Sequence, residues 1–173
     1  MAFGAFGNGP QQMEKSAFFK WFSMKPAGDL LWRPESEVFR DQVSLAAETG
    51  ADGRFSMLTL SLTRAMLDEP AQTMFGRDIV KSFLEDVAGR DRHVRALSAE
   101  IFHRAPGTPV LRGQAPPDLP DEPSAGFLTV MGELPAWSTE PGRVKISMTN
   151  RDGRLEVRAD RKPSRGFLAR LFS

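Results

Sequence analysis

The most regular pattern along the chain is a pair of alternating segments near its C-terminal end. Apolar side chains take every second position in residues 144–148 and again in residues 155–159, as in strands that bury one face. Between them lies Asp152-Gly153, a dipeptide that suits a two-residue type I′ turn. The pattern therefore predicts a β-hairpin formed by residues 144–150 and 154–160.

The register of this hairpin follows from its charges. A two-residue turn places Met148 opposite Val157 and Lys145 opposite Asp160. A four-residue loop would instead set Lys145 against Arg158, and like charges directly opposite each other destabilise a strand pair. We therefore expect the two-residue turn.

Residues 38–64 fit two different patterns. As a hairpin, residues 43–47 and 58–62 alternate on either side of a Gly-Ala-Asp-Gly turn at residues 50–53. As helices, Phe55, Leu58, Leu62 and Met66 would share one face. The alternation of leucine with serine and threonine is the more regular pattern, so we favour the hairpin, with the helical alternative left open.

Two helices are predicted in the middle of the chain. Apolar positions in residues 79–87 recur at helical spacing, and Gly89 follows where a helix would end. Asp91 is a suitable N-cap for a second helix, whose apolar face contains Val94, Leu97, Ile101 and Phe102. The two helices should pack together against a sheet.

The remaining segments are less regular. Residues 1–12 are rich in glycine and glutamine and are expected to be disordered, and residues 13–22 predict a short amphipathic helix with three phenylalanines on one face. Residues 105–125 contain six of the 13 prolines, which indicates a spacer, a surface arm or a recognition segment. Prolines at every third position from 117 to 123 favour polyproline II there. Residues 127–134 read as a strand.

Together these elements predict an α+β fold. We expect an antiparallel sheet of about five strands with a two-helix layer on one face, ending in a C-terminal β-meander. The domain organisation would be a flexible N-terminus with a short helix (residues 1–25), a single α+β domain with its proline-rich arm (residues 26–163) and a tail (residues 164–173).

Composition excludes several kinds of site. The chain has 173 residues, 40% hydrophobic and 26% charged, which is ordinary for one globular domain. It has no cysteine, so disulfides, thiolate nucleophiles and cysteine-ligated metals are excluded. No apolar run approaches the roughly 18 residues of a membrane span, and the first ten residues do not resemble a secretory signal. We therefore expect a cytoplasmic protein.

Charge is distributed unevenly along the chain. Residues 143–173 contain nine basic and three acidic residues, a net charge of +6, so residues 1–142 carry −5 within a total of +1. The last ten residues combine this basic character with large apolar side chains. At helical spacing these form one stripe flanked by arginines, the composition of a small interfacial helix. The candidate contacts with a protein partner or a membrane are Arg165, Phe167, Leu168, Arg170, Leu171 and Phe172.

A second, less specific set of cations is a candidate for anion contact. Arg90, Arg92 and Arg95 cluster at the start of the second predicted helix, and Arg158 lies on the outward face of the C-terminal hairpin. A dense basic stripe with exposed aromatic rings is typical of nucleic-acid binding. The hairpin has no aromatic residue on either strand, so nucleic acid is not an expected partner.

Candidate catalytic residues are few. His93 and His103 both fall on the second predicted helix, roughly 15 Å apart along its axis, which is too far for one shared metal. The sequence contains no phosphate-binding glycine loop, no nucleophile elbow and no zinc-protease motif. Asp118, Asp121 and Glu122 lack the glycine-centred ladder of a calcium loop. No cofactor is expected.

These observations favour a non-catalytic protein-interaction module, adaptor-like or chaperone-like, that uses its basic-apolar tail, its N-terminal aromatic residues or its proline-rich arm to bind an unidentified protein partner. The alternative is a peripheral membrane protein held on an anionic surface by the tail. A further alternative is an enzyme that uses His93 or His103 as an acid or base, assisted by Arg92, Arg95 or Glu100.

Overall fold

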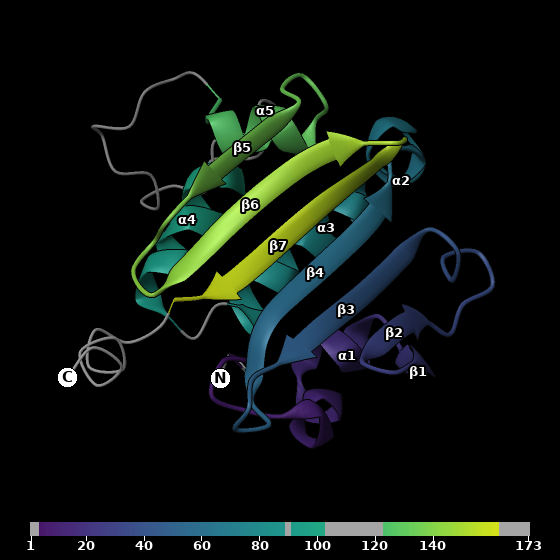
Figure 1. Ribbon diagram of the computed structural model, residues 1–173. Coiled ribbons are helices and arrows are strands. Elements are labelled where there is room, and N and C mark those ends of the chain that lie inside the picture. The colour runs from purple at the N-terminus through teal and green to yellow at the C-terminus, as the bar shows by residue number, and fades with distance from the viewer. Residues whose placement is uncertain (1–3, 89–90, 103–122, 163–173) are drawn as a thin grey trace, which may run out of the picture.

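The computed structural model describes residues 4–88, 91–102 and 123–162. Within these residues, seven strands form one antiparallel sheet in the order β1-β2-β3-β4-β7-β6-β5 (Figure 1). The strands are β1 (Met24–Gly28), β2 (Leu31–Pro34), β3 (Val43–Thr49), β4 (Phe55–Thr63), β5 (Ala136–Thr139), β6 (Val144–Arg151) and β7 (Arg154–Arg161). The helical segments are η1 (Pro10–Lys15), α1 (Ala17–Trp21), α2 (Ala65–Asp68), α3 (Thr73–Ser82), η2 (Phe83–Val87), α4 (Arg92–Phe102) and α5 (Ala125–Val130).

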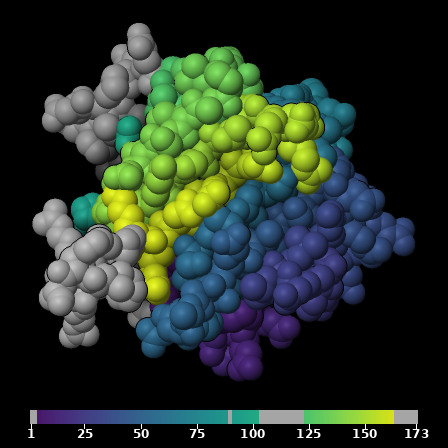
Figure 2. Space-filling model, viewed as in Figure 1, coloured from purple at the N-terminus to yellow at the C-terminus, as the bar shows by residue number. Residues whose placement is uncertain are grey.

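The helices lie on one face of the sheet. Figure 1 looks onto the opposite face, with α3, α4 and α5 behind the strands. In the space-filling view the side chains of β3, β4, β6 and β7 form much of the surface toward the viewer (Figure 2). This confirms the predicted α+β fold and the helical layer on one face, although the described sheet has seven strands where about five were expected.

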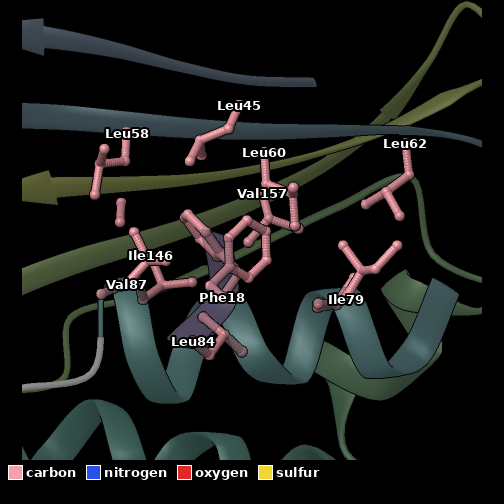
Figure 3. Packing of buried hydrophobic residues seen from close by; sticks show 14 of the residues in the cluster. Phe18, Leu45, Leu58, Leu60, Leu62, Ile79, Leu84, Val87, Ile146 and Val157 are labelled. Atoms are coloured by element: carbon pink, nitrogen blue, oxygen red, sulfur yellow. The ribbon is translucent and has the colours of Figure 1, made fainter. Parts of the chain in front are cut away.

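The core lies between the sheet and the helices. Alternate residues of β3, β4, β6 and β7 point inward and are buried, as the period-2 patterns require. Figure 3 shows the ring of Phe18 lying between the leucines of β3 and β4 on one side and Leu84 on the other. Burial of each large side chain in this way contributes roughly 1.5 to 3 kcal/mol to the stability of the folded state.

Both predicted hairpins are present. In β6–β7 the partners are Met148 with Val157 and Lys145 with Asp160, the register that the charges indicated. Asp152 and Gly153 have φ values of 54° and 71°, as a type I′ turn requires. In β3–β4, Leu45 pairs with Leu60, so residues 38–64 contain a hairpin and not two helices.

The central helices are confirmed and extended. The predicted helix at residues 79–87 begins earlier, at Thr73, and its last turn is the π-helix η2. Asp91 acts as the expected cap of α4, because its Oδ1 accepts a hydrogen bond from the backbone N–H of His93 at 2.8 Å.

The predicted strand at residues 127–134 is wrong. Residues 125–130 form α5, and the first strand of the C-terminal meander is β5, further along the chain. Ser124 begins α5 by accepting the N–H of Phe127 at 3.1 Å, and the hydroxyl of Thr129 donates to the carbonyl oxygen of Ala125. Capping and burial therefore override the β preference of this apolar stretch.

From Ala5 onward the N-terminal segment is part of the core, whereas residues 1–12 were expected to be disordered. Ala5, Met13, Phe18 and Phe19 are buried. The carboxylate of Asp86 accepts the N–H of Phe18 at 2.9 Å and so joins the start of α1 to η2. The short helix expected at residues 13–22 is divided at Ser16 into η1 and α1. Strands β1 and β2, which follow, were not predicted.

Candidate interaction groove

A groove opens where the end of α1, the segment after β2 and the start of α3 meet. Its volume is about 390 Å³, within the range of pockets that hold small ligands or side chains. We call it the aromatic groove, because four of its lining residues have aromatic rings: Trp21, Phe22, Phe39 and Phe75.

The first wall is the C-terminal end of α1. Ser16 caps this helix by accepting the N–H of Phe19 at 3.2 Å. Phe18 and Phe19 face the core, while Trp21 projects outward. The chain then turns at Ser23, whose φ is 48°. A positive φ is uncommon for serine and stops the helix sharply, so Trp21 and Phe22 stay at the mouth of the groove.

The second wall is the segment between β2 and β3. Its backbone is held by side chains: Arg33 donates to the carbonyl of Arg40 at 3.0 Å, and Arg40 donates to the carbonyl of Glu35 at 2.9 Å. The N–H of Glu35 also donates to the carbonyl of Ser23, which joins this wall to the first one. These bonds fix the position of Phe39, whose ring lies 5.6 Å from that of Phe75.

The third wall is formed by α2 and α3, which approach each other unusually closely. A Cβ atom at Gly76 would lie 2.1 Å from the backbone oxygen of Met66, so only glycine fits at this position. This close approach places Met66, Phe75 and Ile79 side by side in the groove lining.

The chemistry of the groove is apolar with a single charge, because Glu35 is the only ionisable residue among those that line it. The large hydrophobic side chains that are exposed in the described part of the chain all belong to this neighbourhood: Trp21 at 77%, Val38 at 63%, Met74 at 67% and Phe75 at 52%. Val38 and Met74 each adjoin a lining residue in sequence. Such a cluster of exposed apolar groups is typical of a binding surface.

The tail residues proposed from the sequence belong to a part of the chain that the structure does not describe. Outside the described residues lie all six candidate contacts, Arg165, Phe167, Leu168, Arg170, Leu171 and Phe172. Residues 105–122 of the proline-rich arm lie outside them as well. The contact role of the tail therefore remains a prediction.

The candidate anion-contact arginines do not form one site. Arg90 lies outside the described residues, and Arg92 and Arg95 are exposed on α4 in the helical layer. Arg158 lies on β7, where its guanidinium makes two hydrogen bonds to Asp160, at 2.9 and 3.0 Å. The hydrogen bond to Asp160 raises the pKa of Arg158. The same carboxylate neutralises its charge locally, which weakens its case as an anion contact.

The structure places one of the two candidate catalytic histidines. His93 is exposed on α4 and lines neither the aromatic groove nor the polar hollow formed by residues 7–12 and 52–54. His103 lies outside the described part. Among the residues that the structure covers, no group of three or more histidine or acidic side chains could hold a metal ion.

The aromatic groove was not predicted from the sequence. Its rings come from positions 21, 22, 39 and 75, and no periodic pattern connects the three segments that carry them. One feature of the sequence partly indicated it. The phenylalanines at 18, 19 and 22 share a helical face, so Trp21 lies beside that face and not at a core position.

Within the three described ranges no helix has the length and apolar character needed to cross a bilayer. Comparison with known proteins finds no match among family models, curated proteins or solved structures.

Proposed function

We propose that this protein is a non-catalytic protein-interaction module of the cytoplasm, and that the aromatic groove binds an apolar segment of its protein partner. The observation that carries this proposal is the gathering of the exposed large hydrophobic side chains around one groove. Scattered exposed hydrophobic residues need no explanation, but a cluster of them exposes apolar surface to water at a cost in free energy that binding removes.

The groove has the features of a binding hot spot. Tryptophan is enriched among the residues that dominate protein interfaces, and phenylalanine is enriched in their buried cores. Trp21 and Phe75 present rigid rings, and the hydrogen-bonded segment after β2 holds Phe39 opposite Phe75. A groove fixed in this way loses little conformational entropy when a partner binds.

Site-specific photo-cross-linking tests the proposal. Benzoylphenylalanine replaces Phe75 in one protein and Glu100, which is exposed on α4, in a second. Both are irradiated in native lysate. We expect a defined protein adduct from position 75 only, and we expect Trp21→Ala in the same chain to reduce its yield at least about fivefold, because it removes an anchor worth roughly 1 kcal/mol or more.

Arg95→Ala is the matched control, since Arg95 is exposed but lies on α4, away from the groove. It should leave the adduct unchanged. Equal adducts from positions 75 and 100, or an adduct that is insensitive to Trp21→Ala, would contradict a groove-directed interaction.

The composition of the tail favours a second candidate, a peripheral membrane protein. Arg165 and Arg170 flank four large apolar residues in residues 164–173, and cations near an anionic membrane each contribute about 1 kcal/mol. Binding to phosphatidylserine vesicles at low salt, lost when both arginines are changed to glutamate, would support this function. No binding at low salt would reject it.

A further inference from the structure

The aromatic groove has an acidic segment along one wall. The segment 35–41, which forms its second wall, contains three acidic residues and one basic residue, Arg40. The guanidinium of Arg40 is engaged with the carbonyl of Glu35. Among the lining residues only Glu35 is charged. A matching occupant would therefore be apolar, with cations beside its apolar groups.

The chain itself contains such a segment. Residues 163–173 have four large apolar side chains, two arginines and no acidic residue. Its charge of +2 matches the −2 of segment 35–41, and arginine also stacks well on aromatic rings such as that of Trp21. The described surface of the same protein thus provides a groove whose chemistry is complementary to its own tail.

Geometry prevents the whole apolar stripe of this tail from filling the groove of its own copy. Trp32 pairs with Leu45, Leu45 with Leu60 and Leu60 with Val157, so Pro34 at the groove lies level with Leu155. Arg161, at the end of β7, is six residues further along and three strands away, which separates it from Pro34 by about 25 Å.

The chain after β7 is too short for all four apolar residues of its stripe to reach the groove of the same copy. Six residues lead from Arg161 to Phe167, and they span at most about 22 Å when fully extended. Phe167 therefore falls short of the groove in its own copy, and Leu168 reaches its edge only when the chain is fully extended. Figure 1 shows the same relation, with the arrowhead of β7 and the segment between β2 and β3 at opposite sides of the sheet.

We propose that residues 163–173 of one copy bind in the aromatic groove of a second copy, and that two copies exchange these segments reciprocally to form a dimer. Reciprocal exchange closes the assembly with two-fold symmetry, whereas one-way docking would continue into chains of molecules. The inference rests on the proposed function, since it names the occupant of the same groove.

The test uses the full-length protein and light scattering after size-exclusion chromatography, over about 1 to 100 µM. We expect a dimer. Phe75→Glu in the groove and Leu171→Asp in the tail should each raise the dissociation constant at least about tenfold, as loss of a central anchor does. Trp21→Ala serves as a second groove variant if Phe75→Glu does not fold. Glu133→Ala, exposed between α5 and β5, is the control and should leave the dimer unchanged.

Mixing the two variants gives a sharper result. A pair made of one Phe75→Glu copy and one Leu171→Asp copy retains one intact groove and one intact tail, so the mixture should dimerise more than either variant alone. A wild-type monomer throughout this range, or a dimer that is unaffected by both substitutions, would overturn the inference. A tail that cross-links only to the groove of its own copy would overturn it too.

The two proposals fail differently. If the wild type is monomeric while the adduct at position 75 still depends on Trp21, the exchange is wrong and the interaction module stands. If the adduct at position 75 is a second copy of this chain, joined through residues 163–173, the exchange is confirmed and the partner is the protein itself.

Discussion

The hairpin β6–β7 and the aromatic groove are organised in opposite ways. The hairpin is contiguous, and each strand is adjacent in sequence to the strand with which it pairs. The groove brings together α1, the segment after β2 and the α2–α3 pair, which are held by contacts between residues far apart in the chain. A change in the hairpin should therefore have a local effect, whereas one change at a groove wall should disturb several elements.

The largest effect is expected from Gly76→Ala. In an exposed helix this substitution normally stabilises a protein by roughly 0.5 to 1 kcal/mol. Here the new Cβ would lie 2.1 Å from the backbone oxygen of Met66, so α2 and α3 must separate. We expect the free energy of unfolding to fall by about 3 kcal/mol, as measured by urea denaturation, and the groove to widen.

Gly28→Ala is the matched control. A Cβ atom there meets the side chain of Leu31 at 3.4 Å, an ordinary contact. Its effect should stay within about 0.5 kcal/mol. Equal effects at positions 28 and 76 would mean that the close approach of α2 and α3 does not position the groove wall.

The same contrast explains what could be predicted from the sequence. The Asp152-Gly153 turn, the alternation on both sides of it and the Lys145–Asp160 pair are local features, and together they predicted the register of β6–β7 correctly. Strands β1 and β2 have no such pattern. Pro26 and Gly28 disrupt β1, and its pairing is irregular between these two residues.

Two further features that the sequence did not predict have the same physical origin. The segment 127–134 has the composition of a strand, but the Ser124 cap and the packing of Phe127 make it a helix. The close approach at Gly76 depends on Met66, ten residues away, and nothing in the local pattern indicates it. Tertiary contacts determine the structure of these elements, and the local pattern of a single sequence does not reveal such contacts.

An intermediate effect is expected from Gly153→Ala in the hairpin. The position has open space around it but a φ of 71°, which costs a residue with a Cβ atom roughly 1 to 2 kcal/mol. Thermal unfolding should show this loss, while hydrogen exchange at Phe18 and in α3 stays as in the wild type. Asp152→Asn is the control, because asparagine also tolerates a positive φ. Faster exchange in α3 would show that the hairpin and the groove are coupled.

The smallest effect is expected at the open end of the hairpin, where Lys162 reaches the loop before β6. Its Nζ lies 2.8 Å from a carboxylate oxygen of Glu140. The hydrogen bond from Lys162, together with its charge, lowers the pKa of Glu140 below its ordinary value of 4.5. A carboxyl whose pKa is lowered by folding stabilises the folded state above its unfolded pKa, and this contribution is lost as the pH falls through the folded pKa.

Lys162→Ala should therefore raise the pKa of Glu140 toward 4.5, as followed by NMR titration of its carboxyl carbon. Stability at neutral pH should change little, because the pair is exposed to solvent. Lys145→Ala is the control. Lys145 also lowers the pKa of Glu140, but it is the weakest of the contributing causes, so its removal should shift the titration less. A larger shift from Lys145 than from Lys162 would mean that the strand charges, rather than the hydrogen bond, govern this end of the hairpin.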